Sequence, residues 1–301
     1  MPTFELYKSN GNARLPDFDI NEKLNDPALY APSGALVDAV NVALALGQPL
    51  LITGEPGTGK TQLAYHVSHF FGLGEPLVFT VQTSSVASEL FYKYDALGHF
   101  QYNQNNAAQL DAQGIERQFI SFNALGQAIR ARERKVVLID EVDKAPRDLP
   151  NDVLFAIENL SFRVPEINRV FEADHKHRPI IILTSNSEKN LPDAFMRRVV
   201  YYHIPFPSAS ELLYILSRKT EQISQADLDK LIRHFIKIRD LKLKKPPSTA
   251  ELIYWVLLLQ KVNFPVKKIN EALSWEERNQ LLMTYSVLAK NKEDLEMLRK
   301  M

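Results

Sequence analysis

The sequence has 301 residues, with 36 basic and 36 acidic side chains and 45% hydrophobic residues. These values exclude collagen-like, disordered and disulfide-stabilised chains, and the absence of cysteine excludes thiolate catalysis and Cys-ligated metals. The zero net charge gives no overall attraction to nucleic acid or to an anionic membrane. The N-terminal residues lack the basic start and apolar core of a signal peptide, and the apolar runs are too short to span a bilayer. We therefore expect a cytoplasmic protein with no membrane partner.

Five short apolar segments recur along the first two thirds of the chain, separated by stretches in which apolar residues have helical spacing. Continuous apolar character is typical of strands that are buried on both faces of a parallel sheet. Strands that alternate with helices predict an α/β, doubly wound core. The apolar segments are 49–53, 77–81, 135–139, 180–184 and 199–204, and the helical stretches include 62–71, 122–132 and 152–159.

The pattern changes after Pro205–Pro207, where only helical spacing continues. All eleven glycines lie at or before Gly126, so the C-terminal part has little need of backbone with positive φ. We predict two domains, namely an N-terminal segment with the α/β core over residues 1–206 and an all-helical lid domain over residues 207–301. The predicted helical stretches of the lid are 210–219, 224–238, 249–262 and 274–290.

The segment GEPGTGKT, at residues 54–61, follows an apolar strand and precedes a helical stretch. It matches the phosphate-loop pattern G-x-x-x-x-G-K-[ST] in full. Its glycines allow successive backbone N–H groups to point at phosphate oxygens, and the start of the next helix adds positive potential. We expect Lys60 near the β- and γ-phosphates and the Thr61 hydroxyl on Mg²⁺. Because the loop binds phosphate rather than the base, it does not distinguish ATP from GTP.

The strand at 135–139 runs directly into two adjacent acids, Asp140 and Glu141. Ligands of open α/β sheets bind at the carboxyl edge of the strands, where these acids are expected. Asp140 is a candidate Mg²⁺ ligand, normally acting through water. Glu141 is a candidate general base that orients and deprotonates a water for attack on the γ-phosphate. Two acids with different roles indicate hydrolysis rather than transfer to a small molecule.

Two further motifs carry candidate site residues. Asn186 follows the strand at 180–184, where its amide is expected to hold the attacking water beside Glu141, although Ser-Asn after a strand is also common turn chemistry. The segment LPDAFMRR ends in Arg197 and Arg198. These arginines either complement the dipole of a short helix or reach the nucleotide of a neighbouring subunit as an arginine finger.

The motifs GEPGTGKTQLA, LIDEVDKAP, LTSN and LPDAFMRR occur in the order and at the spacing of the AAA+ ATPases. Over about residues 25–260 the sequence resembles the MoxR-like, dynein-related branch of that family. The resemblance implies a P-loop NTPase with a parallel five-stranded sheet and a helical lid, which hydrolyses ATP with Mg²⁺. It further implies a homo-hexameric ring with the active site between subunits. A chaperone-like role in remodelling or assembling a protein client follows, frequently with a von Willebrand factor A-domain partner.

The same resemblance assigns roles to individual residues. Glu141 becomes the catalytic acid of the Walker B motif, and Asn186 becomes the sensor 1 amide. Thr61 and Asp140 become the Mg²⁺ ligands. The implied nucleotide-binding residues are Gly54, Glu55, Pro56, Gly57, Thr58, Gly59, Lys60, Thr61 and Gln62.

The arginine finger and the lid arginine are less directly assigned. Arg198 fits the finger position better than Arg197 because a bulky residue follows it. The branch often carries a sensor 2 arginine in the lid, but the matching position here is Ala250. Lys244 or Lys245 is a candidate replacement, and both are equally compatible with a solvated surface.

Residues 83–117 lie where the related branch carries an insert, and they include the Asn- and Gln-rich stretch 101–113, which we expect to be exposed. The aromatic stretch 91–100 either faces a pore or client or anchors the loop to the core. The segment 162–171 is a candidate hairpin before the strand at 180–184.

Two other functions remain open. A nucleic-acid-associated or restriction-type motor would use the basic stretch 231–245. A solvated helix face is the simpler explanation of that stretch, because acidic residues elsewhere balance the net charge of the chain. A non-hydrolysing, nucleotide-gated platform is disfavoured by Glu141, because a module that only binds nucleotide needs no water-activating acid.

Overall fold

The computed structural model describes residue 7 and residues 19–106, 109–145, 153, 156–187 and 191–301. Contacts between residues divide the chain into two compact units. The sheet unit comprises residues 32–54 and 60–204, and the helical unit comprises residues 1–31, 55–59 and 205–301. The helical unit thus includes helix α1 (Asp19–Asn25), which the sequence analysis placed in the N-terminal domain.

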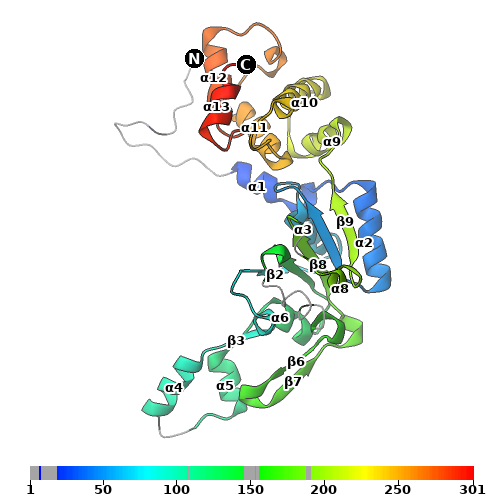
Figure 1. Ribbon diagram of the computed structural model, residues 1–301, viewed down its shortest axis with the longest axis vertical. Helices are drawn as coiled ribbons and strands as arrows, with labels where there is room; N and C mark the ends of the chain where they lie inside the picture. Colours follow the sequence, from blue (N-terminus) through cyan, green and yellow to red (C-terminus); the bar gives the residue numbers. More distant parts are fainter. Residues whose placement is uncertain (1–6, 8–18, 107–108, 146–152, 154–155, 188–190) are drawn as a thin grey trace. The chain divides into compact units, whose positions relative to one another are not determined.

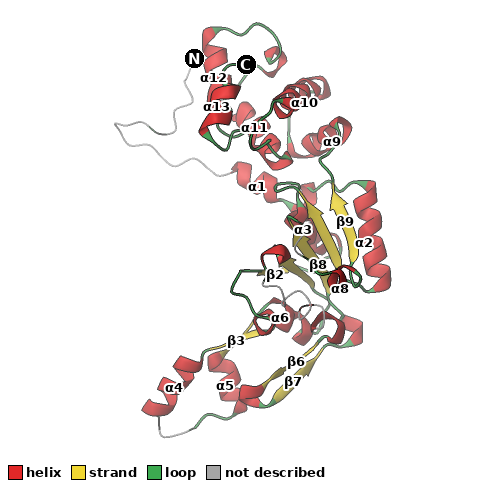
Figure 2. Cartoon of the chain, viewed as in Figure 1, coloured by secondary structure: helices red, strands yellow, loops and turns green. Residues whose placement is uncertain are grey.

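The sheet unit is built on a five-stranded sheet in which all neighbouring strands are parallel (Figure 1, Figure 2). The strand order is β2-β5-β8-β1-β9. Residues 136–139 have no exposed surface at all, which explains their continuous apolar sequence. The predicted α/β fold with a parallel five-stranded sheet is confirmed. The strands are β1 (Leu50–Gly54), β2 (Leu77–Thr80), β5 (Val136–Asp140), β8 (Ile180–Ser185) and β9 (Val200–Ile204).

The register of the sheet brings the chemically important strand ends together. Thr53 of β1 lies opposite Ser185 of β8, and Ile139 of β5 lies opposite Leu183 of β8. The carboxyl ends of β1, β5 and β8 therefore meet at one edge, which is where ligands of such sheets bind. The helices packed against this sheet are α2 (Gly34–Leu46), α3 (Lys60–Phe70) and α6 (Ala124–Arg130), and the short α8 (Asp193–Met196) precedes β9.

Two antiparallel strand pairs lie outside the main sheet. Strand β3 (Tyr92–Tyr94) pairs with β4 (Ile120–Phe122), and β6 (Ser161–Val164) pairs with β7 (Arg169–Glu172). The second pair is the hairpin that the segment 162–171 suggested. Helices α4 (Ala96–Asn105) and α5 (Ala112–Phe119) cover much of the Asn- and Gln-rich stretch, to which we had assigned no helix. Each follows an aspartate whose side chain caps it, which is a local signal for the start of a helix.

Part of the aromatic stretch 91–100 anchors the insert to the core, and the alternative that the stretch faces a pore or client stays a prediction. Phe91 is buried and stacks on Phe162, with 4.8 Å between the ring centroids, and Phe162 in turn stacks on Phe171 at 5.1 Å. These rings anchor the insert to the core of the sheet unit. Phe100 on α4, in contrast, is 60% exposed, so anchoring does not explain it.

The helical unit contains the lid helices, which begin at strong caps. Ser208, Ser248 and Ser274 each form a capping box with the glutamate three residues later. The predicted stretch 274–290 is too long, because the helix that begins at Trp275 ends at Thr284. A separate helix capped by Asn291 follows it. No helix in the described part of the chain is long and apolar enough to cross a membrane. The helices are α9 (Ala209–Lys219), α10 (Gln225–Asp240), α11 (Thr249–Lys261), α12 (Trp275–Thr284) and α13 (Lys292–Leu298).

Helix α1 joins the helical unit through specific polar contacts. The Lys219 ammonium donates hydrogen bonds to the carbonyl oxygens of Lys23 and Leu24, at 3.1 and 3.0 Å. Tyr254 donates to Asn21 Oδ1 at 2.9 Å. Burial lowers the pKa of Lys219, and the carbonyls at the end of α1 compensate for the loss of water around its ammonium.

We predict that Gly126→Ala destabilises the sheet unit. A Cβ at this position of α6 would collide with the carbonyl oxygen of Phe91, and the backbone there has no flexible end that could move aside. Overpacking of this kind costs about 1–3 kcal/mol, which urea unfolding would measure. Gly34→Ala is the matched control, because nothing lies within 4 Å of its Cβ position. Equal stabilities of the two variants would contradict the prediction.

Candidate active site

The phosphate-loop residues have the backbone that their glycines predict. Gly54, Gly57 and Gly59 have φ values of 148°, 77° and 88°, a region that side chains with a Cβ rarely adopt. Gly54 ends β1, and Lys60 begins α3, so the loop leaves a strand and opens a helix as expected. The Thr58 hydroxyl donates to the Glu55 carbonyl at 2.8 Å and helps to fix the curve of the loop.

The Lys60 ammonium links the loop to the tip of the neighbouring strand. It donates to the carbonyl oxygen of Gly54 and to Asn186 Oδ1, both at 2.9 Å. Lys60 is 8% exposed, and this burial lowers the pKa of its ammonium, whereas Asp140, Asp143 and Glu141 raise it. The structure thus places the predicted phosphate-binding cation beside the predicted sensor amide.

Thr61 and Asp140 converge as a magnesium site requires. The Thr61 hydroxyl lies 3.3 Å from both carboxylate oxygens of Asp140. A hydroxyl and a single carboxylate are hard oxygen ligands of the kind that Mg²⁺ combines with water and phosphate oxygens. These residues fit Mg²⁺.

Thr184 is a site residue whose role sequence reasoning missed. Its hydroxyl donates a short hydrogen bond to Asp140 and accepts the backbone N–H of Glu141 at 3.0 Å. A single buried hydroxyl therefore organises both adjacent acids. The sequence places Thr184 near the carboxyl end of a predicted strand, but its contacts depend on a strand pairing that the sequence does not show.

Glu141 has a left-handed backbone, with φ at 61° and ψ at 45°. This conformation is uncommon for a residue with a side chain and is held here by the hydrogen bond to Thr184. The Glu141 carboxylate pairs with the Lys144 ammonium at 2.6 Å, a half-exposed contact within one turn of chain. Asp143, another residue that we had not singled out, accepts the backbone N–H of Asn186 at 3.2 Å and so fixes the predicted sensor.

The two candidate finger residues are exposed and follow α8 directly. Arg198 pairs with Glu158 of its own chain, with 3.4 Å between Nε and Oε1. The structure contains one chain, so the proposed reach of Arg198 or Arg197 into a neighbouring subunit stays a prediction.

Lys244 and Lys245, the candidate replacements for the sensor 2 arginine, make their described contacts away from the phosphate loop. The backbone N–H groups of Lys244 and Lys245 donate to Asp294, and the Lys244 ammonium pairs with Glu293 at 2.6 Å. Neither contact involves the phosphate loop. Arg239, which carries no motif signal in the sequence, instead lies against that loop and pairs with Glu55 at 3.3 Å.

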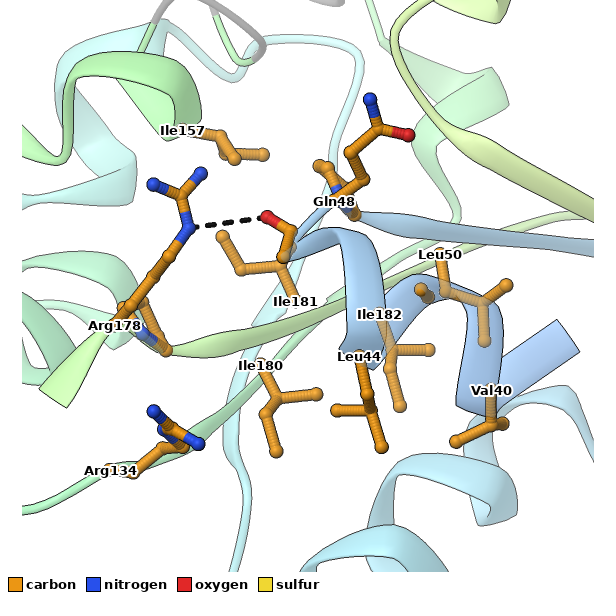
Figure 3. Close-up of a pocket in the computed structure, with 14 residues that line it drawn as sticks. Val40, Leu44, Gln48, Leu50, Arg134, Ile157, Arg178, Ile180, Ile181 and Ile182 are labelled. Carbon is orange, nitrogen blue, oxygen red and sulfur yellow. Dashed lines mark hydrogen bonds between the residues drawn. The ribbon is translucent and has the colours of Figure 1, made fainter. Parts of the chain in front are cut away.

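A pocket of about 90 Å³ lies at the opposite end of the strands (Figure 3). Leu50, at the start of β1, and Ile180, at the start of β8, line it together with Leu44 of α2. Arg178 flanks it and donates from Nε to the Gly47 carbonyl at 3.2 Å. The pocket is therefore separate from the carboxyl edge that holds Lys60 and Asp140.

The chain matches the model of a known protein family. The family model described as AAA domain (dynein-related subfamily) matches residues 49–199, which is just over half of the chain. The matched range contains the phosphate loop, the acidic strand tip and Asn186. No curated protein matches the chain.

We predict that Thr184→Val frees the Glu141 amide. Valine keeps the shape of threonine but offers no acceptor, so exchange of the Glu141 amide hydrogen should accelerate roughly tenfold, as expected for the loss of one hydrogen bond. Thr184→Ser keeps the hydroxyl and should preserve slow exchange. NMR or mass-spectrometric hydrogen exchange gives the comparison, and equal protection in both variants would contradict the assigned contact.

Proposed function

We propose that this chain, which belongs to the AAA domain family (dynein-related subfamily), hydrolyses ATP to drive conformational work on a protein client. The observation that carries the proposal is the contact of the Lys60 ammonium with Asn186, beside the acidic tip formed by Asp140 and Glu141. Membership of the family supports ATP-driven activity in general. The intact set of groups supports hydrolysis in particular, because binding alone requires no base.

Each group has a defined task in this proposal. Backbone N–H groups of residues 54–62 and the Lys60 ammonium bind the phosphates, while Thr61 and Asp140 would hold Mg²⁺, which supplies positive charge to the phosphate oxygens. Glu141 accepts the proton of a water whose oxygen bonds to the γ-phosphorus. The bond from that phosphorus to the bridging oxygen breaks, and ADP departs with the electron pair. The Asn186 amide orients the water.

We predict that Glu141→Gln abolishes turnover and retains nucleotide. The amide keeps the size of the side chain but accepts no proton, so hydrolysis should fall at least about 100-fold, within the range of general-base catalysis. Phosphate release measures turnover, and binding of a fluorescent ADP measures affinity. Lys60→Ala is the contrasting variant and should lose affinity as well. Wild-type turnover in Glu141→Gln would show that Glu141 is not the base.

We further propose that the chain forms a homo-hexameric ring in which Arg198 completes the pocket of the adjacent subunit. An arginine that stabilises transition-state charge in trans is worth about 10³-fold or more in rate. The exposure of Arg198 and its weak, half-exposed pairing with Glu158 leave it available for such a contact.

Mixing two inactive variants tests the ring. Lys60→Ala removes phosphate binding, whereas Arg198→Ala leaves its own loop intact, so each alone should be inactive. In randomly mixed rings about a quarter of the interfaces combine an intact loop with an intact arginine, and activity should return to about that share. The same mixture made with Arg197→Ala identifies which arginine acts. Full activity of Arg198→Ala, or of a monomer by native mass measurement, would refute the assignment.

The client is proposed on the resemblance to MoxR-like proteins, which implies chaperone-like remodelling and a von Willebrand factor A-domain partner. The proposed cytoplasmic setting rests instead on the absence of cysteine and of a signal-peptide pattern in the sequence. A nucleic-acid-associated or restriction-type motor that uses the basic stretch 231–245 is the alternative, and the neutral net charge of the chain disfavours it.

A further inference from the structure

The guanidinium group of Arg239, in the last turn of α10, is held on several sides. It lies over the Phe206 ring at 3.5 Å from the centroid and donates to the Pro247 carbonyl. One Nη is 3.3 Å from Glu55 Oε2, in the phosphate loop. The arginine side chain is only 16% exposed, so its orientation is set before it meets the glutamate.

The start of α11 contacts the same loop two residues further on. The Ala250 N–H donates to the Gly57 carbonyl at 3.1 Å. A Cβ on Gly57 would collide with the Ser248 side chain, so this close approach depends on the glycine. The segment 55–59 is thus held at Glu55 and at Gly57 by neighbouring parts of the helical unit.

We propose that Arg239 is a positioning residue for nucleotide binding, which holds the phosphate loop in its curved form through Glu55. This inference rests on the proposed function. A loop with glycines at 54, 57 and 59 has many accessible conformations, and ordering it upon binding costs entropy. An arginine that orders the loop beforehand lowers this cost and raises affinity.

Arg239 touches the loop but none of Lys60, Glu141 or Asn186 in the contacts described above. Arg239 should therefore stabilise the nucleotide-bound state and the transition state equally. Its loss should raise KM and leave kcat unchanged. Lysine cannot replace it, because one ammonium lacks the planar fork that faces Pro247, Phe206 and Glu55 together.

A double-mutant cycle on the full chain tests the proposal. Arg239→Gln and Glu55→Gln should each raise the Kd for Mg-ADP and the KM for ATP by about 3- to 10-fold, with kcat within about twofold. The double variant should be no weaker than either single variant, because both changes break one contact. Arg233→Gln is the matched control, since it breaks the Arg233–Asp229 pair of the same helix without touching the loop.

Thermal unfolding of each variant establishes that the fold is retained. Unchanged affinity in Arg239→Gln, or effects that multiply in the double variant, would overturn the positioning role while the proposed ATPase stands. A loss of kcat at constant KM would also overturn it. If the unaltered chain bound no nucleotide, the proposed function itself would fail, and this inference would fail with it.

Discussion

The site depends on a buried ammonium group. Lys60 lies at the start of α3 with little exposed surface, and an ammonium in such a place is unfavourable unless hydrogen bonds and opposite charges replace water. The Gly54 carbonyl and Asn186 provide the hydrogen bonds, and the acids after β5 provide the charge. The order β5-β8-β1 brings these groups to one edge. The residues that stabilise the buried Lys60 ammonium are thus the same residues that are proposed to act on the phosphates and the attacking water.

The backbone after β5 explains how two consecutive acids have different surroundings. A continued strand would point Asp140 and Glu141 to opposite faces of the sheet. Instead the chain turns into a left-handed conformation at Glu141, which the Thr184 hydroxyl stabilises from the next strand. Asp140 then faces Thr61, while Glu141 extends toward Lys144. The direction of each carboxylate is therefore set by this turn and by the Thr184 hydroxyl, which contacts both residues.

Much of this arrangement could be predicted from the sequence because its signals are local. The phosphate loop, the acidic strand end and the capped lid helices each depend on neighbouring residues, and the inner strands β1, β5 and β8 have apolar runs with no exposed positions. The edge strands β2 and β9 depart from the predicted burial on both faces, because Val78 and Tyr201 are exposed. The contacts of Thr184, Asp143 and Arg239 could not be predicted in this way. They join residues far apart in the chain, and each side chain is of an ordinary type for its element. Helix α4 was missed because its cap at Asp95, rather than apolar spacing, defines it, whereas α5 has apolar residues four apart at Ile115 and Phe119 that we did not recognise.

The loop belongs to both units at once, and this constrains how they work. Gly54 and Lys60 group with the sheet unit, whereas residues 55–59 group with the helical unit through the contacts of Glu55 and Gly57. Only five residues, 55–59, lie between Gly54 and Lys60. Two of them, Gly57 and Gly59, have positive φ values that residues with a Cβ rarely adopt. The contacts of Arg239 with Glu55 and of Ala250 with Gly57 therefore fix the curve of this segment from within the helical unit.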